Sequence, residues 1–191
     1  MTLTRCMVAI ALAIGLAGQP AWGHTFPPQR TVVVQVERCE LAVLIGYRPG
    51  TGESTTQILG RSSKLTQLRD LMTSYAVAPI TFAMDGVPLV PTSVRAKLGI
   101  EDGGARPIVV VLVTYALPRS GALTVMSKEP RTTRISWQDR RSTRVDLAQA
   151  PAEDKWHAGV ASFLLNLSAP QGDSACVTTA SSRPSPSLAA H

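Results

Sequence analysis

No apolar run in this 191-residue sequence approaches the length of a membrane-spanning helix. The longest run covers residues 7–17, whereas a helix needs roughly 20 apolar residues to cross a hydrocarbon core. Arg5 precedes the run, and Ala21 and Gly23 place small residues where signal peptidase reads them. We therefore expect a signal peptide over residues 1–23, cleavage near Gly23, and a soluble periplasmic or secreted product rather than an integral membrane protein.

Cysteine is scarce, and only Cys39 and Cys176 follow the expected cleavage point. The sequence has no Cys-x-x-Cys spacing that would indicate zinc binding or redox cycling. In an exported chain an even pair of cysteines favours a disulfide, which would tie the C-terminal segment to the first strands. The alternative is two independent thiols, because sequence does not show whether two distant cysteines meet.

Common catalytic motifs are also missing. The sequence has neither Gly-x-Ser-x-Gly nor His-Glu-x-x-His, and it contains three histidines in all. The glycine-containing stretch at residues 50–55 has Glu53 where a phosphate-binding loop requires lysine. We therefore expect a non-enzymatic binding or interaction module, with a secreted enzyme of unfamiliar type as an alternative.

Short apolar stretches separated by turn signals dominate the rest of the chain. They predict strands over residues 31–37, 41–47, 80–84, 87–90, 94–98, 108–113, 123–126, 133–137, 143–147 and 160–167. Residues 108–113 are all apolar and mostly β-branched, which we interpret as a central strand buried on both faces. Asp85 and Gly86 form a two-residue turn signal between two of the strands.

One segment, residues 62–75, has the period of a helix. Its apolar residues recur every three or four positions: Leu65, Leu68, Leu71, Met72 and Tyr75. We expect this helix to cover one face or end of a sheet. The predicted fold class is therefore mainly β, with a sandwich-like (immunoglobulin-like) single domain over residues 24–168 and one packed α-helix. A disordered Ser/Pro/Ala-rich tail is expected over residues 169–191.

Positive charge is concentrated in residues 128–144. The whole chain carries a formal net charge of +6, and this segment contributes much of the excess. Its candidate anion-binding residues are Arg131, Arg134, Arg140, Arg141 and Arg144, which could bind an anionic surface or a polysaccharide. Nucleic acid is not expected, because the segment lacks stacking aromatics apart from Trp137, which we place in the core. The alternative is a solvated strand face whose bases block edge-to-edge aggregation.

Cleavage after Gly23 would make His24 the first residue of the mature chain. The free α-amine and the imidazole of an N-terminal histidine together chelate copper(II) through nitrogen ligands. In this respect the sequence resembles two families of exported β-sandwich proteins, the periplasmic copper-resistance carriers and the copper-dependent polysaccharide monooxygenases. The resemblance implies a copper site made by His24 and His157, with Asp154 beside it. The alternative is an accidental N-terminal histidine, with His157 an ordinary surface residue.

A second resemblance concerns the order of the predicted elements. The predicted order is two strands, then the helix at residues 62–75, then residues 80–89, which carry Asp-Gly-Val-Pro near their end. This order resembles the exported N-terminal β-domain that precedes the membrane helices of some nickel/cobalt permeases. The resemblance implies metal handling or protein contact at most. Transport is not implied, because no membrane helix follows in this sequence.

Overall fold

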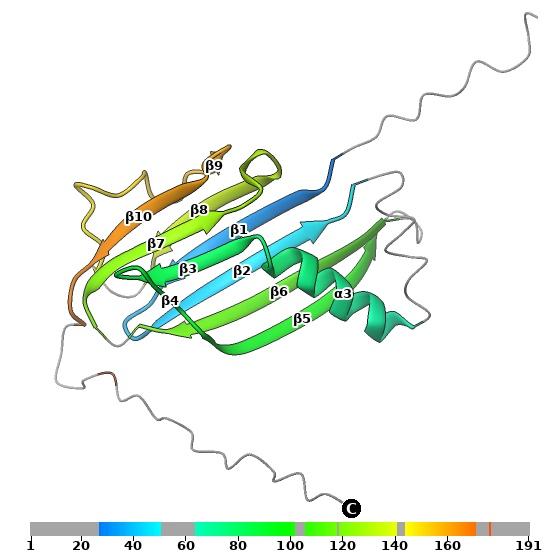
Figure 1. The fold of residues 1–191 in the computed structure, drawn as a ribbon, viewed down its shortest axis with the longest axis horizontal. Helices are drawn as coiled ribbons and strands as arrows, with labels where there is room; N and C mark the ends of the chain where they lie inside the picture. The colour runs from blue at the N-terminus through cyan, green and yellow to red at the C-terminus, as the bar shows by residue number, and fades with distance from the viewer. Residues whose placement is uncertain are drawn as a thin grey trace, which may run out of the picture.

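The computed structural model describes residues 27–50, 64–101, 106–117, 119–140, 144–170 and 176. Two β-sheets form separate layers, and the α-helix lies in the layer of the smaller sheet (Figure 1). The predicted fold class, mainly β and sandwich-like with one helix, is confirmed. The predicted signal peptide and most of the predicted tail lie outside the described residues. No helix in the described residues is both long and apolar enough to cross a membrane.

The larger sheet has six strands in the order β5-β6-β2-β1-β8-β9. They are β1 (Gln29–Val36), β2 (Glu40–Arg48), β5 (Pro91–Glu101), β6 (Arg106–Ala116), β8 (Thr133–Asp139) and β9 (His157–Ala158). Neighbouring strands are antiparallel except β1 and β8, which run parallel. The strands predicted over residues 31–37 and 41–47 are confirmed as β1 and β2, which form an antiparallel hairpin with Val34 opposite Val43.

The smaller sheet has four strands in the order β10-β7-β3-β4. They are β3 (Ile80–Met84), β4 (Val87–Pro88), β7 (Gly121–Ser127) and β10 (Ser162–Leu167). The predicted turn between β3 and β4 is confirmed, because Asp85 and Gly86 both have positive φ, 51° and 79°, as a tight hairpin requires. The strand predicted over residues 143–147 is wrong, because within the described part of that range, residues 144–147, only Val145 forms a bridge, an isolated one with Leu167.

Helix α3 (Leu65–Val77) contacts β2, β5 and β6 of the larger sheet. Its buried residues are Leu68, Met72 and Ala76, which recur every four positions and so form one stripe. Two residues expected on the buried face are instead exposed, Leu65 by 67% and Tyr75 by 40%. Leu65 is exposed because it is the first residue of the helix. Tyr75 is exposed because it is turned about 100° around the helix axis from Ala76, which belongs to the buried stripe.

Arg30 on β1 joins the end of α3 to the larger sheet. Its buried guanidinium donates hydrogen bonds to the carbonyls of Tyr75 (2.7 Å) and Ala76 (2.9 Å). Both carbonyls lie in the last turn of α3, where no following backbone N–H of the helix is available to bond them. The same group pairs with the Glu129 carboxylate at 3.0 Å and lies 5.2 Å from the centre of the Tyr47 ring. Arg30 therefore caps the helix and fixes its position over the sheet.

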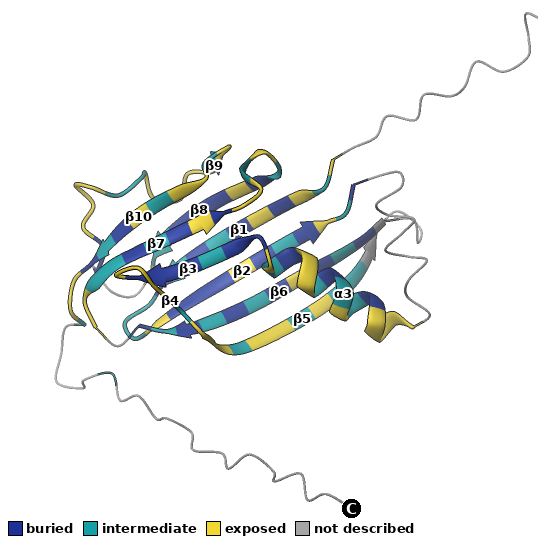
Figure 2. Ribbon diagram, viewed as in Figure 1, coloured by how far each residue is buried: buried dark blue, intermediate teal, exposed yellow. Residues whose placement is uncertain are grey.

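Among the described residues, the smaller sheet and α3 lie on the same side of the larger sheet, so these elements cover one of its two faces (Figure 1). Burial alternates along β1 and β6, as Figure 2 shows. In β6, Val109, Val111 and Val113 are buried with 0% exposure, whereas Val110 on the opposite face is 39% exposed. The prediction that residues 108–113 are buried on both faces is therefore wrong. The strand lies inside the sheet, but it has one core face and one outer face.

Candidate interaction surface

The uncovered face of the larger sheet carries adjacent aliphatic side chains, and we call it the open face. Val33 lies opposite Leu44, and Leu44 lies opposite Leu112. Ile108 and Val110 lie on the same side of β6 as Leu112, because side chains two residues apart share a face. Leu44 is 40% exposed although β2 lies between two other strands. A contiguous apolar surface of this kind is typical of a site that binds a partner.

Basic side chains flank the aliphatic centre of the open face. On the edge strand β5, Arg95 lies opposite Leu112 and Lys97 lies opposite Val110. Arg134 on β8 lies on the other flank, beside Thr31. These three basic residues are exposed, and none of them forms an ion pair with a residue that the structure describes. Glu40, an acidic residue, lies at one end of the face. The three basic residues outnumber it, so positive charge dominates the margins of the open face.

The four predicted anion-binding arginines that the structure describes do not form one site. Arg134 points to the open-face side of β8, Arg131 lies in the short 3₁₀ turn η2 (Pro130–Thr132) before this strand, and Arg140 follows it. β8 has seven residues and therefore spans about 23 Å, so Arg131 and Arg140 lie at opposite ends of it. Arg140 also donates a hydrogen bond to Gln138 at 2.7 Å. Arg141 lies outside the described residues.

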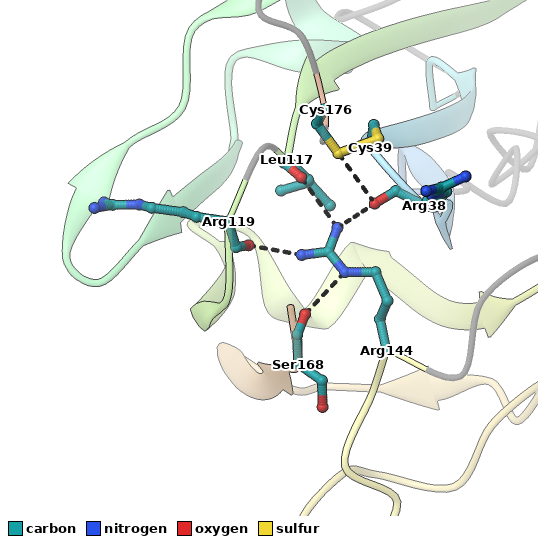
Figure 3. The surroundings of a disulfide bond; sticks show 7 residues. All are labelled: Arg38, Cys39, Leu117, Arg119, Arg144, Ser168 and Cys176. Atoms are coloured by element: carbon teal, nitrogen blue, oxygen red, sulfur yellow. Dashed lines mark hydrogen bonds between the residues drawn. A yellow bond between two sulfur atoms is a disulfide. The ribbon is translucent and has the colours of Figure 1, made fainter. Parts of the chain in front are cut away.

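Arg144 is buried, which corrects its assignment as a surface anion-binding residue. Its side chain is 1% exposed, and its guanidinium faces backbone carbonyls from separate parts of the chain (Figure 3). The acceptors are the carbonyls of Ser168 (3.0 Å), Arg38 (2.6 Å), Leu117 (3.0 Å) and Arg119 (2.6 Å). Burial lowers the pKa of Arg144, and the Asp139 carboxylate opposes that shift. Arg144 therefore joins loops at one end of the sandwich.

The predicted disulfide between Cys39 and Cys176 is confirmed, with the two Cα atoms 5.5 Å apart. It lies beside the Arg144 cluster, because Cys39 follows Arg38, whose carbonyl accepts a hydrogen bond from Arg144 (Figure 3). The N–H of Leu117 also donates to the carbonyl of Cys39 at 2.8 Å. The same end of the sandwich is therefore held by one covalent bond and one buried cation.

His157 lies on β9, opposite Ile135 of β8. Its Nε2 lies 3.1 Å from the carbonyl oxygen of Ala152, and since a carbonyl only accepts, Nε2 is the donor and Nδ1 is the ring nitrogen that this bond does not use. Asp154 lies nearby in sequence with φ of 58°, in a turn. No group of three or more potential metal ligands occurs within the described residues. His24 lies outside them, so the structure does not place the predicted partner of His157.

No protein-family description, no curated protein and no solved structure matches this chain.

Sequence reasoning missed the open face and the two buried arginines. The alternation of Arg95 and Lys97 with apolar residues did predict a half-exposed strand, and these two residues mark the outer side of β5. The β6 run gave no such signal, because both of its faces are apolar. Nothing local distinguishes Arg30 or Arg144 from an exposed arginine, because their acceptors lie far away in the sequence.

Proposed function

We propose that the protein is an exported, non-enzymatic interaction module that binds a partner protein through the open face. The observation that carries the proposal is the aliphatic surface formed by Val33, Leu44 and Leu112 on three adjacent strands, with Val110 beside them. Burying such a surface contributes about 25 cal/mol per Å² of apolar area removed from water, before the entropic cost of association is subtracted. The disulfide and the expected signal peptide support an exported protein.

The charges around the open face favour a partner with carboxylates around an apolar centre. Arg95, Lys97 and Arg134 would each face an acidic group in such a complex, and complementary charge speeds association and aligns the partners. Pairing of two copies through the same face would bring like charges together. The proposed partner is therefore a different protein.

Site-specific cross-linking tests the proposal. A photoreactive amino acid replaces Leu44 in the chain expressed with its own leader in the exporting cell, and cross-linked products are identified by mass spectrometry. The matched control is Leu164, which is 44% exposed against 40% for Leu44 but lies on the outer side of the smaller sheet. We expect one discrete product from position 44 and none from position 164. Equal yields at both positions, or no product from position 44, would contradict the proposed function.

Copper binding by His24 and His157 is the second candidate function. The observation that favours it is the orientation of His157, since metal-binding histidines usually donate their second ring N–H to a carbonyl. β9 also neighbours β8, which in turn neighbours β1, the first described strand after His24. Pro28 and the turn at residues 128–132 line one pocket, and the N–H of Gly159 bonds to the carbonyl of Pro130. The start of the described chain and β9 therefore flank the same turn.

A terminal extension separates this site from accidental binding. Protein that begins at His24 should bind one copper(II) more tightly than the same protein with one residue added before His24, because the extension converts the α-amine into an amide. His157→Ala should weaken binding again if His157 completes the site. Calorimetric titration measures both effects, and equal affinity of all three proteins would exclude the site.

A further inference from the structure

The edge strand β5 has backbone groups that no other described strand pairs. β5 ends the larger sheet, and β6 is its neighbour. In antiparallel pairs, residues that exchange both hydrogen bonds alternate with residues whose N–H and C=O point away. The N–H of Leu117 donates a hydrogen bond to the carbonyl of Cys39, which continues the register of β6 with β2. The backbone N–H and C=O groups of the odd-numbered residues of β6 therefore bond to β2, and those of the even-numbered residues point toward β5.

The register then identifies the outward groups of β5. Arg95 pairs with Leu112 and Lys97 pairs with Val110, so these two residues of β5 bond to β6. The N–H and C=O groups of Val94, Ala96 and Leu98 therefore point outward, at the edge of the sheet. Their side chains lie on the same side of the sheet as α3, because they are opposite the core residues Val113, Val111 and Val109.

A groove runs between this edge and helix α3. Its volume is about 340 Å³, and its lining residues are Arg69, Asp70 and Thr73 from α3 with Val94 and Ala96 from β5. Figure 1 shows α3 crossing in front of β5 and β6. Val94 is 50% exposed in the groove although its side chain points to the core side of the sheet. A strand placed beside β5 would direct alternate side chains into this groove.

We infer that β5 binds an extended, acidic peptide segment of a partner as an added antiparallel strand. The outward N–H and C=O groups would supply backbone hydrogen bonds, and the groove would select small aliphatic side chains at alternate positions. The positions between them would lie opposite Arg95 and Lys97 on the open-face side, where carboxylates are favoured. The site shares Arg95 and Lys97 with the margin of the open face, but the backbone groups of β5 play no part in the proposed function, so tests of these groups distinguish the two proposals.

A second copy of this chain fits the same edge poorly. Antiparallel pairing of two β5 strands centred on Ala96 would place Arg95 of one copy opposite Lys97 of the other. Like charges directly opposite each other destabilise a strand pair. The same basic residues therefore discourage self-association and favour an acidic strand.

The probe is a synthetic peptide that alternates glutamate and valine, and the full mature protein is used throughout. We expect binding by fluorescence anisotropy, together with slower amide hydrogen exchange at Val94, Ala96 and Leu98. N-methylation of the valine amides, which would face β5, should weaken binding about tenfold or more, the ratio that corresponds to one net hydrogen bond. N-methylation of the glutamate amides, which would point away, should leave the affinity unchanged.

Protein variants test the charge and the backbone separately. The double variant Arg95→Glu with Lys97→Glu should lose the glutamate peptide and bind the corresponding lysine peptide. The control Arg134→Glu, on the far flank, should bind the glutamate peptide with the affinity of the wild type. Ala96→Pro removes one outward N–H, which an edge strand tolerates, and should also weaken binding. The inference is overturned by absence of binding, by indifference to both N-methylated peptides, by unchanged exchange at Val94 and Ala96, or by a dimer formed through β5.

Discussion

The cluster around Arg144 yields the sharpest prediction about stability. Arg144→Met keeps most of the apolar stem but removes the guanidinium, so four backbone carbonyls lose their charged donor. The bond to Leu117 is buried, and a hydrogen bond to a charged group contributes ~1.5–3 kcal/mol. Water can partly replace the other three bonds, which are only partly buried, so about 1 kcal/mol is a fair value for each. The free energy of unfolding should therefore fall by about 4.5–6 kcal/mol, much of the ~5–15 kcal/mol typical of a domain.

Urea unfolding of the oxidised protein measures this change through the transition midpoint at an unchanged slope. Arg134→Met is the matched control, because Arg134 is an exposed arginine on the same sheet, and it should alter stability by no more than about 0.5 kcal/mol. Arg144→Lys should be nearly as damaging as Arg144→Met, since one ammonium group cannot reach all four carbonyls. A loss below about 1 kcal/mol for Arg144→Met would refute the structural role assigned to this residue.

Three further predictions concern the core and the disulfide. Val111→Asp should abolish folding because it buries an unpaired charge, whereas the neighbouring variant Val110→Asp, on the open face, should fold. Equal circular dichroism spectra for the two variants would contradict the assignment of faces. Non-reducing peptide mapping should recover Cys39 joined to Cys176, and replacing both by serine should cost about 4–5 kcal/mol for so long a loop, with unchanged thermal unfolding as the contrary result. Burial raises the pKa of Tyr115 to about 12 from 10.0, so the contribution of this residue to stability is fully present below pH 10 and is lost as the pH rises toward 12. Tyr115→Phe should flatten this part of the stability profile against pH. An unchanged profile would assign the loss of stability to other groups.

Local patterns were enough to predict most of the secondary structure. The alternation in residues 80–84 and the Asp85-Gly86 turn indicated β3 and its hairpin, because backbone conformation there is fixed by neighbouring residues. The disulfide was one of two open alternatives, and the structure decides it by bringing Cys39 and Cys176 together.

Features that depend on distant residues were not predictable. The run at residues 108–113 conceals which face is exposed, because Val110 and Val111 have the same side chain and opposite environments. The burial of Arg144 depends on carbonyls contributed by other segments, such as Arg38. The parallel pairing of β1 with β8 likewise leaves no trace in either strand alone.

The parallel pairing of β1 and β8 has a consequence for when this chain can fold. Arg30 and Thr133 meet across this pair although 103 residues separate them in the sequence. A chain that emerges N-terminus first, from a ribosome or through a translocation channel, therefore carries its first hairpin with one edge of β1 unpaired until β8 arrives. Such late, long-range pairing slows folding and delays completion of the larger sheet. Cys176 follows later still, so only a chain that has emerged almost completely can close the covalent link to Cys39.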